Sequence, residues 1–411
     1  MTRAEASGGK HVVIAGGGIA AVETLLALRS LASTRIDVTL VAPHDDLHYR
    51  PATVSEPFSE PRARRYRLDA ICRDLGATLH VDTAAAVDPA GRELVTGSAA
   101  RLPYDALVIA VGARARRPLA HAHTFLADEH AESLHGLVRD LEEGYVGRLA
   151  LVVPAKAGWS LPIYELALKA AQRARSLGSE GLELTIVTPE DVPLAAFRGA
   201  GSDAVARLLD EAGITVLCST YVSDFDGRTL ALAPGSRSLA VDAVLALPEL
   251  SGPRLAGVPC DSDGFVHVDE RGRVPGLDGV YAIGDATTFP IKQGGIAAQQ
   301  ADVAAASVAQ ALGLDVRQPR TRPVRRAILL TGAEPLYVTA TIAGGESVAS
   351  HASRQCMWWP PHKVAARHLA PYLADREEIH PATARRDALD LRLEQDPPVA
   401  HAEGEAAGIE G

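Results

Sequence analysis

Residues 11–23 read His-Val-Val-Ile-Ala-Gly-Gly-Gly-Ile-Ala-Ala-Val-Glu, and this stretch decides the fold. The apolar run at residues 12–15 predicts a buried parallel strand. Three glycines follow, and the Ala- and Leu-rich segment after them favours a helix up to residue 30. The order is therefore strand, tight turn and helix, which is how a dinucleotide-binding unit begins.

The spacing of the small residues explains how such a turn receives a dinucleotide. Gly16 permits the turn, and Gly18 lets backbone N–H groups approach a pyrophosphate. Ala21 holds the third position, where helix and strand pack closely. The anion then lies at a helix N-terminus. A plain strand-to-helix connection is the alternative for a glycine turn, but here both flanking elements are recognisable in the sequence.

The composition favours an α/β protein of two or three domains. The chain has 411 residues, of which 47% are hydrophobic and 36 are glycine. Its formal net charge of −10 argues against nucleic acid or an anionic membrane surface as a partner, because neither attracts an acidic protein. We expect small-molecule partners instead, and we leave a homodimer open.

Cysteine usage and the absence of long apolar runs predict a reduced, cytoplasmic chain. The four cysteines are far apart and show no metal-site spacing, so no metal is expected. The first ten residues lack the apolar core of a signal peptide, and no run approaches the ~18 apolar residues of a membrane span. We therefore expect no integral membrane segment.

The second predicted strand, residues 36–42, departs from the usual dinucleotide fingerprint. An acidic residue at its end usually binds the ribose. Here the chain continues Pro43-His44-Asp45, so Asp45 or backbone groups must serve. The loop at residues 47–58 follows the strand and contains Arg50 and Pro51. Loops at this edge of an α/β sheet bind ligands, so we expect this loop at the site.

Two later stretches also have the form of an apolar strand followed by a turn of small residues. The first is residues 104–113 and the second is residues 279–286, where Asp285 stands just past the strand. Lys292 and two glycines follow, and then an Ala- and Gln-rich stretch favours a helix to about residue 312.

With these three motifs the chain resembles the flavoproteins with two dinucleotide-binding domains, the pyridine nucleotide-disulfide oxidoreductase type. Within them it resembles the branch of sulfide:quinone oxidoreductases and type II NADH dehydrogenases. The resemblance implies that the first glycine turn receives the FAD pyrophosphate, that residues 108–113 close over the cofactor, and that Asp285 holds the ribityl chain. The helix after Gly294 would aim its positive end at the flavin pyrimidine. Val111 is a departure, since the family usually has threonine there.

The resemblance thus implies noncovalent FAD. The cofactor-binding residues it implies are Gly16, Gly18, Ile19, Ala20, Ala21, Pro43, Arg50, Pro51, Ala110, Val111, Gly112, Gly284, Asp285, Lys292, Gly294 and Gly295.

The resemblance also implies an α/β fold with two Rossmann-like dinucleotide-binding domains, the second inserted in the first, plus a C-terminal subdomain. We expect the FAD-binding domain at residues 1–114 and 249–330, and the inserted, degenerate NAD(P)-binding-like domain at 115–248. A C-terminal flavin-side or interface segment would span 331–375, including an apolar helix at 364–373. Residues 376–411 are charged and predict a disordered tail.

The glycine turn of the inserted domain is degenerate. When Glu165 is aligned with Glu23, Gly158 falls on Gly16, Ser160 on Gly18, and residue 163, an isoleucine, on residue 21. A serine keeps a phosphate at a greater distance, and an isoleucine pushes helix from strand. A conventional NAD(P)H site is therefore doubtful.

Three residues are candidates for chemistry. Cys356 lies where one of the two flavin-flanking cysteines of the sulfide:quinone enzymes is expected, but residues 155–162 contain no second one. It is either a lone thiolate nucleophile or an inert thiol. Glu165 occupies the place of a flavin-facing glutamate in the family; desolvation would raise its pKa for proton delivery, unless it is exposed. Lys292 would stabilise a reduced, anionic flavin by charge, or would pair with a surface carboxylate.

Three functions remain open from the sequence. The first is an FAD-dependent oxidoreductase that passes electrons from a small donor to a quinone-like or other acceptor. The second is an NAD(P)H dehydrogenase of the type II kind, or an enzyme with sulfide:quinone oxidoreductase-like activity. The third is a non-catalytic flavoprotein whose Trp358-Trp359 face binds a partner.

Overall fold

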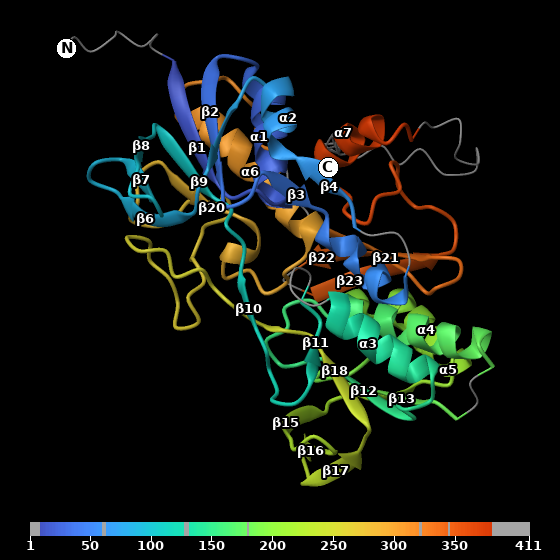
Figure 1. Ribbon diagram of the computed structural model, residues 1–411. Coiled ribbons are helices and arrows are strands. Elements are labelled where there is room, and N and C mark those ends of the chain that lie inside the picture. The colour runs from blue at the N-terminus through green and yellow to red at the C-terminus, as the bar shows by residue number, and fades with distance from the viewer. Residues whose placement is uncertain are drawn as a thin grey trace, which may run out of the picture.

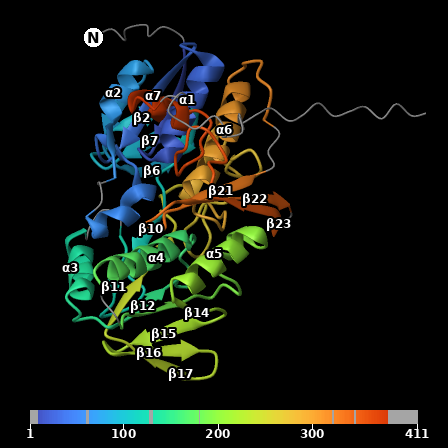
Figure 2. The same cartoon turned by 90° about the vertical axis from the view of Figure 1, so that its right-hand side faces the viewer.

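Two parallel β-sheets, an upper one and a lower one in Figure 1, form the frame of the molecule. The computed structural model describes residues 9–59, 63–126, 131–178, 181–319, 323–343 and 346–379. A smaller antiparallel sheet lies above the helices of the lower unit, next to the start of helix α6 (Gly294–Ala311), as Figure 2 shows.

The upper sheet has five parallel strands in the order β20-β9-β1-β2-β5. The strands are Lys10–Ala15 (β1), Ile36–Ala42 (β2), Thr78–Val81 (β5), Ala106–Ile109 (β9) and Val280–Ala282 (β20), and the helices around them are Ile19–Ala32 (α1), Leu68–Asp74 (α2) and Gly294–Ala311 (α6). Strand β9 is buried along its whole length, as expected for a parallel sheet covered on both faces. Because β1, β9 and β20 are neighbours, the carboxyl ends of the three motif strands meet at one edge.

The lower sheet repeats this architecture with five parallel strands in the order β11-β18-β12-β13-β14. The strands are His123–Thr124 (β11), Arg148–Val152 (β12), Glu183–Val187 (β13), Thr215–Leu217 (β14) and Ala243–Ala246 (β18), and the helices are Ala131–Glu142 (α3), Leu161–Ser176 (α4) and Ala200–Glu211 (α5). Strand β12, its turn and α4 thus correspond to β1, its turn and α1.

The two units are joined by a pair of antiparallel strands, Arg114–Arg116 (β10) and Glu249–Ser251 (β19). All strands of the lower sheet lie between β10 and β19 in the chain, so the second unit is inserted in the first. This confirms the predicted fold class. The domain boundaries at residues 114, 248 and 330 stay predictions.

Small antiparallel sheets and short helices complete the two units. Their bounds are Asp46–His48 (β3), Arg65–Arg67 (β4), Ala84–Asp88 (β6), Glu93–Thr96 (β7), Arg101–Pro103 (β8), Tyr221–Phe225 (β15), Thr229–Ala233 (β16), Arg237–Ala240 (β17), Arg50–Phe58 (η1), Ala195–Phe197 (η2) and Gly284–Ala286 (η3).

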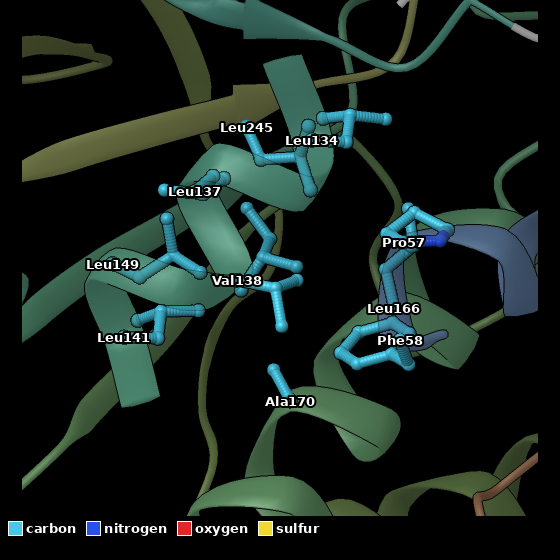
Figure 3. A pocket seen from close by; sticks show the side chains of 11 residues that line it. Pro57, Phe58, Leu134, Leu137, Val138, Leu141, Leu149, Leu166, Ala170 and Leu245 are labelled. Carbon is cyan, nitrogen blue, oxygen red and sulfur yellow. The ribbon is translucent and has the colours of Figure 1, made fainter. Parts of the chain in front are cut away.

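The 3-10 helix η1 reaches from the upper unit onto the lower one and packs there against α3 and α4. Figure 3 shows Pro57 and Phe58 of η1 facing leucines of α3 across an apolar pocket, with Leu166 of α4 beside Phe58. The pocket has a volume of about 10 Å³, which is at the lower limit for one water molecule. It is therefore a packing contact between the units, with no room for an organic substrate.

The C-terminal sheet consists of Val324–Leu329 (β21), Leu336–Ala343 (β22) and Glu346–Ser353 (β23) in an antiparallel meander. The predicted boundary at residue 330 falls after β21, although β21 pairs with β22. One face of this sheet packs on the lower unit through Ala327, Leu329 and Val338. The sheet is thus packed on the lower unit beside the start of α6.

The predicted helix at residues 364–373 is wrong in its first half. Helix α7 spans Leu369–Arg376, and the five residues before it are not helical. Val364 and Ala366 instead pack into the core of the upper unit. The charged tail predicted from residue 376 lies outside the described residues from residue 380 onward. Among the described helices, none combines the length and the apolar character needed to cross a membrane.

Candidate active site

The three sequence motifs meet at the carboxyl edge of the upper sheet. Gly16 has a φ of +134°, and a Cβ atom added to it would lie 2.2 Å from the carbonyl oxygen of Ala110. A Cβ atom on Gly284 would lie 3.2 Å from the Cβ of Ala20. The first turn therefore contacts both later motifs so closely that these two positions require glycine.

Two other glycines at this edge face open space. Gly18 is the N-cap of α1, and a Cβ atom built on it would meet no protein atom within 4 Å; the same holds for Gly112 after β9. Ala21, one turn into α1, is fully buried. The space beside the free N–H groups at the start of α1 suits a pyrophosphate, which binds at helix N-termini.

The N-terminus of α6 opens onto the same edge. Gln293 caps the helix by accepting the Ile296 N–H through its Oε1 atom at 3.1 Å. Gly294 lies between α1 and the C-terminal segment, because a Cβ atom there would lie 3.0 Å from side-chain atoms of Ile19 and of Val364. Gly295 adjoins the capping side chain. The positive end of α6 therefore lies at the same edge as the first glycine turn. That it faces the flavin stays a prediction.

Asp285 lies at this edge with unused hydrogen-bonding capacity. Its carboxylate is mostly buried and accepts no hydrogen bond from the described residues. Burial raises its pKa, against the attraction of Lys292 and Arg50. A buried carboxylate without donors fits sugar or ribityl hydroxyl groups, which would supply them. With the open N-terminus of α1, this makes the residues present a fit for FAD.

Lys292 bridges the two units rather than standing free. Its Nζ donates to the carbonyl oxygen of Thr287 and lies 3.9 Å from the ring centroid of Phe265. Its main-chain N–H donates to the carbonyl oxygen of Gly158 at 3.0 Å. Burial lowers its pKa to about 8, opposed mainly by Asp285. A role beside the flavin stays a prediction, and the structure already explains the ammonium group by its local contacts.

The remaining predicted cofactor residues lie around the same edge. Pro43 is exposed directly after β2, Arg50 and Pro51 begin η1, and Val111 follows β9. Arg50 is near enough to Asp285 to interact with it electrostatically. Contacts of these residues with FAD stay predictions.

Glu165 is not an exposed helix glutamate. Its side chain is fully buried on α4, and both carboxylate oxygens accept hydrogen bonds from the Nζ of Lys363, at 2.6 and 2.8 Å. The Leu330 N–H donates to Oε1 at 2.8 Å. Lys363 precedes Val364, whose N–H donates to the Tyr49 hydroxyl. The ion pair therefore lies where α4, β21 and the C-terminal segment converge on the start of α6.

The two partners of this pair have pKa values that burial moves toward each other. Desolvation raises the pKa of Glu165, opposed chiefly by Lys363. Desolvation lowers the pKa of Lys363, opposed chiefly by Glu165. Burial thus opposes the charged form of each group, while the ion pair favours it. The partner of Glu165 is Lys363, and a proton-holding role for Glu165 stays a prediction.

Cys356 has a hydrogen-bonded thiol. Its Sγ is 2.8 Å from the carbonyl oxygen of Trp358, to which it donates, and its side chain is half-buried. Trp358 is buried and packs edge-on against Tyr337 with 5.2 Å between ring centroids. The bulk of this tryptophan is thus core rather than exposed surface. Whether Cys356 reacts stays a prediction.

The turn of the lower unit is closed by its own side chains. Ser160 is the N-cap of α4, as Gly18 is of α1, which agrees with the sequence alignment. Its hydroxyl donates to Glu190 at 2.9 Å, and the Tyr164 hydroxyl donates to the same carboxylate at 2.6 Å. The Ala195 N–H adds a third donor at 2.9 Å. Glu190 stands just after strand β13, where the ribose-binding acid of a dinucleotide domain is expected.

Two further buried carboxylates, Glu23 and Asp302, lie side by side between α1 and α6. Glu23 on α1 accepts the N–H groups of His368 and Leu369, at 2.9 and 2.6 Å, and so caps α7. Asp302 on α6 lies beside it, and its Oδ1 is buried without a hydrogen-bond donor. Among the described residues, Glu23, Asp302 and His368 are the three possible metal ligands that come within 4.8 Å of one another. The capping bonds already explain Glu23.

The Asp302→Asn variant should lose less stability than the wild type between about pH 5 and about pH 9. Burial first, and then Glu23, raises the pKa of Asp302 from 3.8 to about 8, and burial raises that of Glu23 from 4.5 to about 7. Both pKa values are higher in the folded than in the unfolded state. The stability that the two groups contribute is therefore complete at low pH and is lost progressively as the pH rises to about 8. Urea unfolding at both pH values should show a difference of roughly 1–3 kcal/mol. Equal losses in the two proteins would refute the pairing.

Comparison with known proteins agrees with this geometry. Residues 10–311 match the pyridine nucleotide-disulphide oxidoreductase family. The ferredoxin reductase component of chlorobenzene dioxygenase from Cupriavidus sp. (strain PS12) is 31% identical over 304 residues, which are 69% of each chain. The ferredoxin–NAD(+) reductase subunit of the benzene 1,2-dioxygenase system from Pseudomonas putida is 29% identical over 298 residues, again 69% of each chain.

A solved structure extends the likeness to the C-terminal part. The sulfide:quinone oxidoreductase of Aquifex aeolicus has a TM-score of 0.77 and 20% identity, over 84% of this chain and 87% of that one. At this identity the likeness is one of fold. The family match covers most of the chain and confirms the predicted resemblance. The chain therefore belongs to the pyridine nucleotide-disulphide oxidoreductase family and is an FAD-dependent oxidoreductase.

Proposed function

We propose that this enzyme passes electrons from a small donor other than NAD(P)H through FAD to a quinone-like or other acceptor. The observation that carries the proposal is the closed turn of the lower unit. Besides Ser160, Tyr164 and the Ala195 N–H, the Thr188 hydroxyl also donates to Glu190. Each carboxylate oxygen therefore accepts two hydrogen bonds, and no lone pair is left for an incoming ribose. A nucleotide would have to break these bonds and lose their free energy before it could bind.

The packing around the turn before α4 also argues against a bound nucleotide phosphate. Ile163 is fully buried at the position where a close helix-to-strand approach needs a small residue, and Ser160 is almost fully buried at the N-cap. Pro162 in the first turn removes a backbone N–H that would otherwise be available to a phosphate. The N-terminus of α4 is thus a poor anion site, in contrast to that of α1.

The residues of the upper unit would hold the cofactor in the following way. The N–H groups after Gly18 would receive the pyrophosphate, and Asp285 would accept hydrogen bonds from hydroxyl groups of the cofactor. When bound, FAD supplies reversible transfer of two electrons. The Glu165–Lys363 pair would hold a proton between α4 and the C-terminal segment, where burial keeps water away from both groups.

A ferredoxin is the second acceptor class to consider. The relatives from Cupriavidus and Pseudomonas are ferredoxin reductases by name, and one of them is 31% identical to this chain. The name of the Pseudomonas relative also includes NAD(+). The closed turn argues against NAD(H) as the electron donor of this enzyme. It does not constrain the acceptor, which can be a ferredoxin or a quinone.

NADH and NADPH should reduce the flavin of the purified holoenzyme slowly or not at all. The experiment is anaerobic stopped-flow mixing at 450 nm, in which dithionite serves as the control that the flavin is reducible. The Ser160→Gly variant removes one of the donors to Glu190 and should accept NADH better than the wild type. Bleaching of the wild type by NADH at the rate of an ordinary NADH dehydrogenase would refute the proposal and establish the NAD(P)H-dependent alternative.

A further inference from the structure

Arg326 on β21 is a half-buried cation for which the described residues provide no partner. The part of the chain that the structure describes offers its guanidinium no ion pair, hydrogen bond or aromatic ring. Burial lowers its pKa, and no carboxylate opposes that shift. Its neighbour Arg325, in contrast, donates to the carbonyl oxygen of Ala196 and to the Ser347 hydroxyl. A guanidinium desolvated without an acceptor costs free energy unless a ligand pairs with it.

The strand register places further donors beside Arg326. Arg326 pairs with Thr339 of β22, and Thr339 pairs with His351 of β23, so the three side chains stand in one row on one face of the sheet. The row runs from the half-buried Arg326 and Thr339 to the exposed His351. The other residues of this face whose side chains the structure describes are Val324, Ile328, Tyr337, Thr341, Ala349 and Ser353. None of these six has a carboxylate, and the nearest acidic residue in the register, Glu346, pairs with Ala343 at the far end of the sheet.

The row lies next to the predicted flavin site. The Gln293 side chain, which caps α6, donates through Nε2 to the carbonyl oxygen of Arg326 at 2.6 Å. On the other side, Ile328 packs with Tyr337 and Trp358. The opposite face of the sheet packs on the lower unit, so the row lies on the face turned away from that unit. Figure 2 shows the sheet beside the start of α6.

We propose that Arg326, Thr339 and His351 bind an anionic oxyacid group, such as a carboxylate or phosphate, of the enzyme's small substrate. A guanidinium, a hydroxyl and an imidazole provide the donors that an oxyanion requires, and Arg326 provides a charge-assisted bond from a site already desolvated. The inference rests on the proposed function in so far as it names a small substrate. Binding itself needs no turnover, so the two can fail separately.

The test is calorimetric titration of the oxidised holoenzyme with benzoate and, separately, with inorganic phosphate. The wild type should bind at least one of them, and the stronger of the two indicates whether the group is a carboxylate or a phosphate. The Arg326→Gln variant should bind it at least about tenfold more weakly, because a charge-assisted hydrogen bond is lost. The matched control is Arg207→Gln, which removes an exposed arginine of α5 with no partner among the described residues.

Stability separates this role from a structural one. Arg326→Gln replaces an uncompensated cation with a neutral group, so its Tm should equal or exceed that of the wild type. Its FAD content should be unchanged. The proposal fails if neither anion binds to the wild type, if the variant binds as tightly as the wild type, or if it loses Tm or FAD. The last result would make Arg326 part of the fold or of the cofactor site.

Discussion

The Gly18→Val variant should be isolated as a folded protein without FAD. The structure makes this expectation sharp, because a Cβ atom at Gly18 meets no protein atom within 4 Å and the backbone there has an ordinary φ of −89°. The fold therefore tolerates the side chain. The isopropyl group would instead occupy the space through which the pyrophosphate approaches the N–H groups of α1. Loss of two or more charge-assisted hydrogen bonds corresponds to a roughly 100-fold or greater loss of FAD affinity.

The measurement compares the FAD-to-protein ratio with the Tm of the apoprotein. The matched control is Gly16→Val, two residues earlier in the same turn. Gly16 has a φ of +134°, and its added Cβ would lie 2.2 Å from a backbone oxygen, so that variant should fail to fold. Full yellow colour in Gly18→Val would mean that the pyrophosphate lies elsewhere. An unfolded Gly18→Val would contradict the open space in the structure.

The contrast between these glycines also shows what the sequence can reveal. The motif at residues 11–23 predicts strand, turn and helix because its signals are local: an apolar run, three glycines and a helix-forming segment. It does not distinguish the two glycines. That Gly16 serves the fold and Gly18 faces empty space depends on Ala110 of the neighbouring strand, almost a hundred residues later.

The lower unit and the C-terminal segment show the same limit. The alignment of Ser160 with Gly18 was correct, since both are N-caps. The acid that closes the turn, Glu190, was not recognised, because its contact with Ser160 spans 30 residues and requires the pairing of β12 with β13. Helix α7 begins later than predicted for a similar reason: a distant residue of α1, Glu23, provides its cap.

The Glu165–Lys363 pair joins residues that are 198 positions apart in the sequence, so no local sequence pattern predicts it. The usable signal was a single lysine within an apolar C-terminal stretch, which is unusual because lysine is seldom buried without a partner. Glu165 itself is a candidate through the family resemblance, which implies a flavin-facing glutamate at this place of the middle-domain helix. The sequence therefore indicated one carboxylate, whereas the structure shows a pair with shared electrostatics.

Breaking the Glu165–Lys363 pair should strongly destabilise the folded protein. Glu165→Gln keeps the acceptor for the Leu330 N–H but leaves the Lys363 ammonium buried without a counter-ion. Lys363→Met leaves the Glu165 carboxylate buried without its counter-ion. Each change should lower the free energy of unfolding by about 3–5 kcal/mol. The double variant, in which both groups are neutral, should recover most of this loss, as measured by urea unfolding at neutral pH.

The double variant also decides whether the pair has a chemical role. If the pair only holds the C-terminal segment in place, the double variant should resemble the wild type in every respect once stability is restored. We expect instead that reoxidation of the dithionite-reduced enzyme by a soluble benzoquinone will show an altered pH dependence in the double variant and in Glu165→Gln alike, because neither retains the carboxylate that would hold the proton. A pH profile identical to that of the wild type would limit Glu165 to packing. Since stability is restored in the double variant and the carboxylate is not, the two readouts separate a folding role from a proton-holding one.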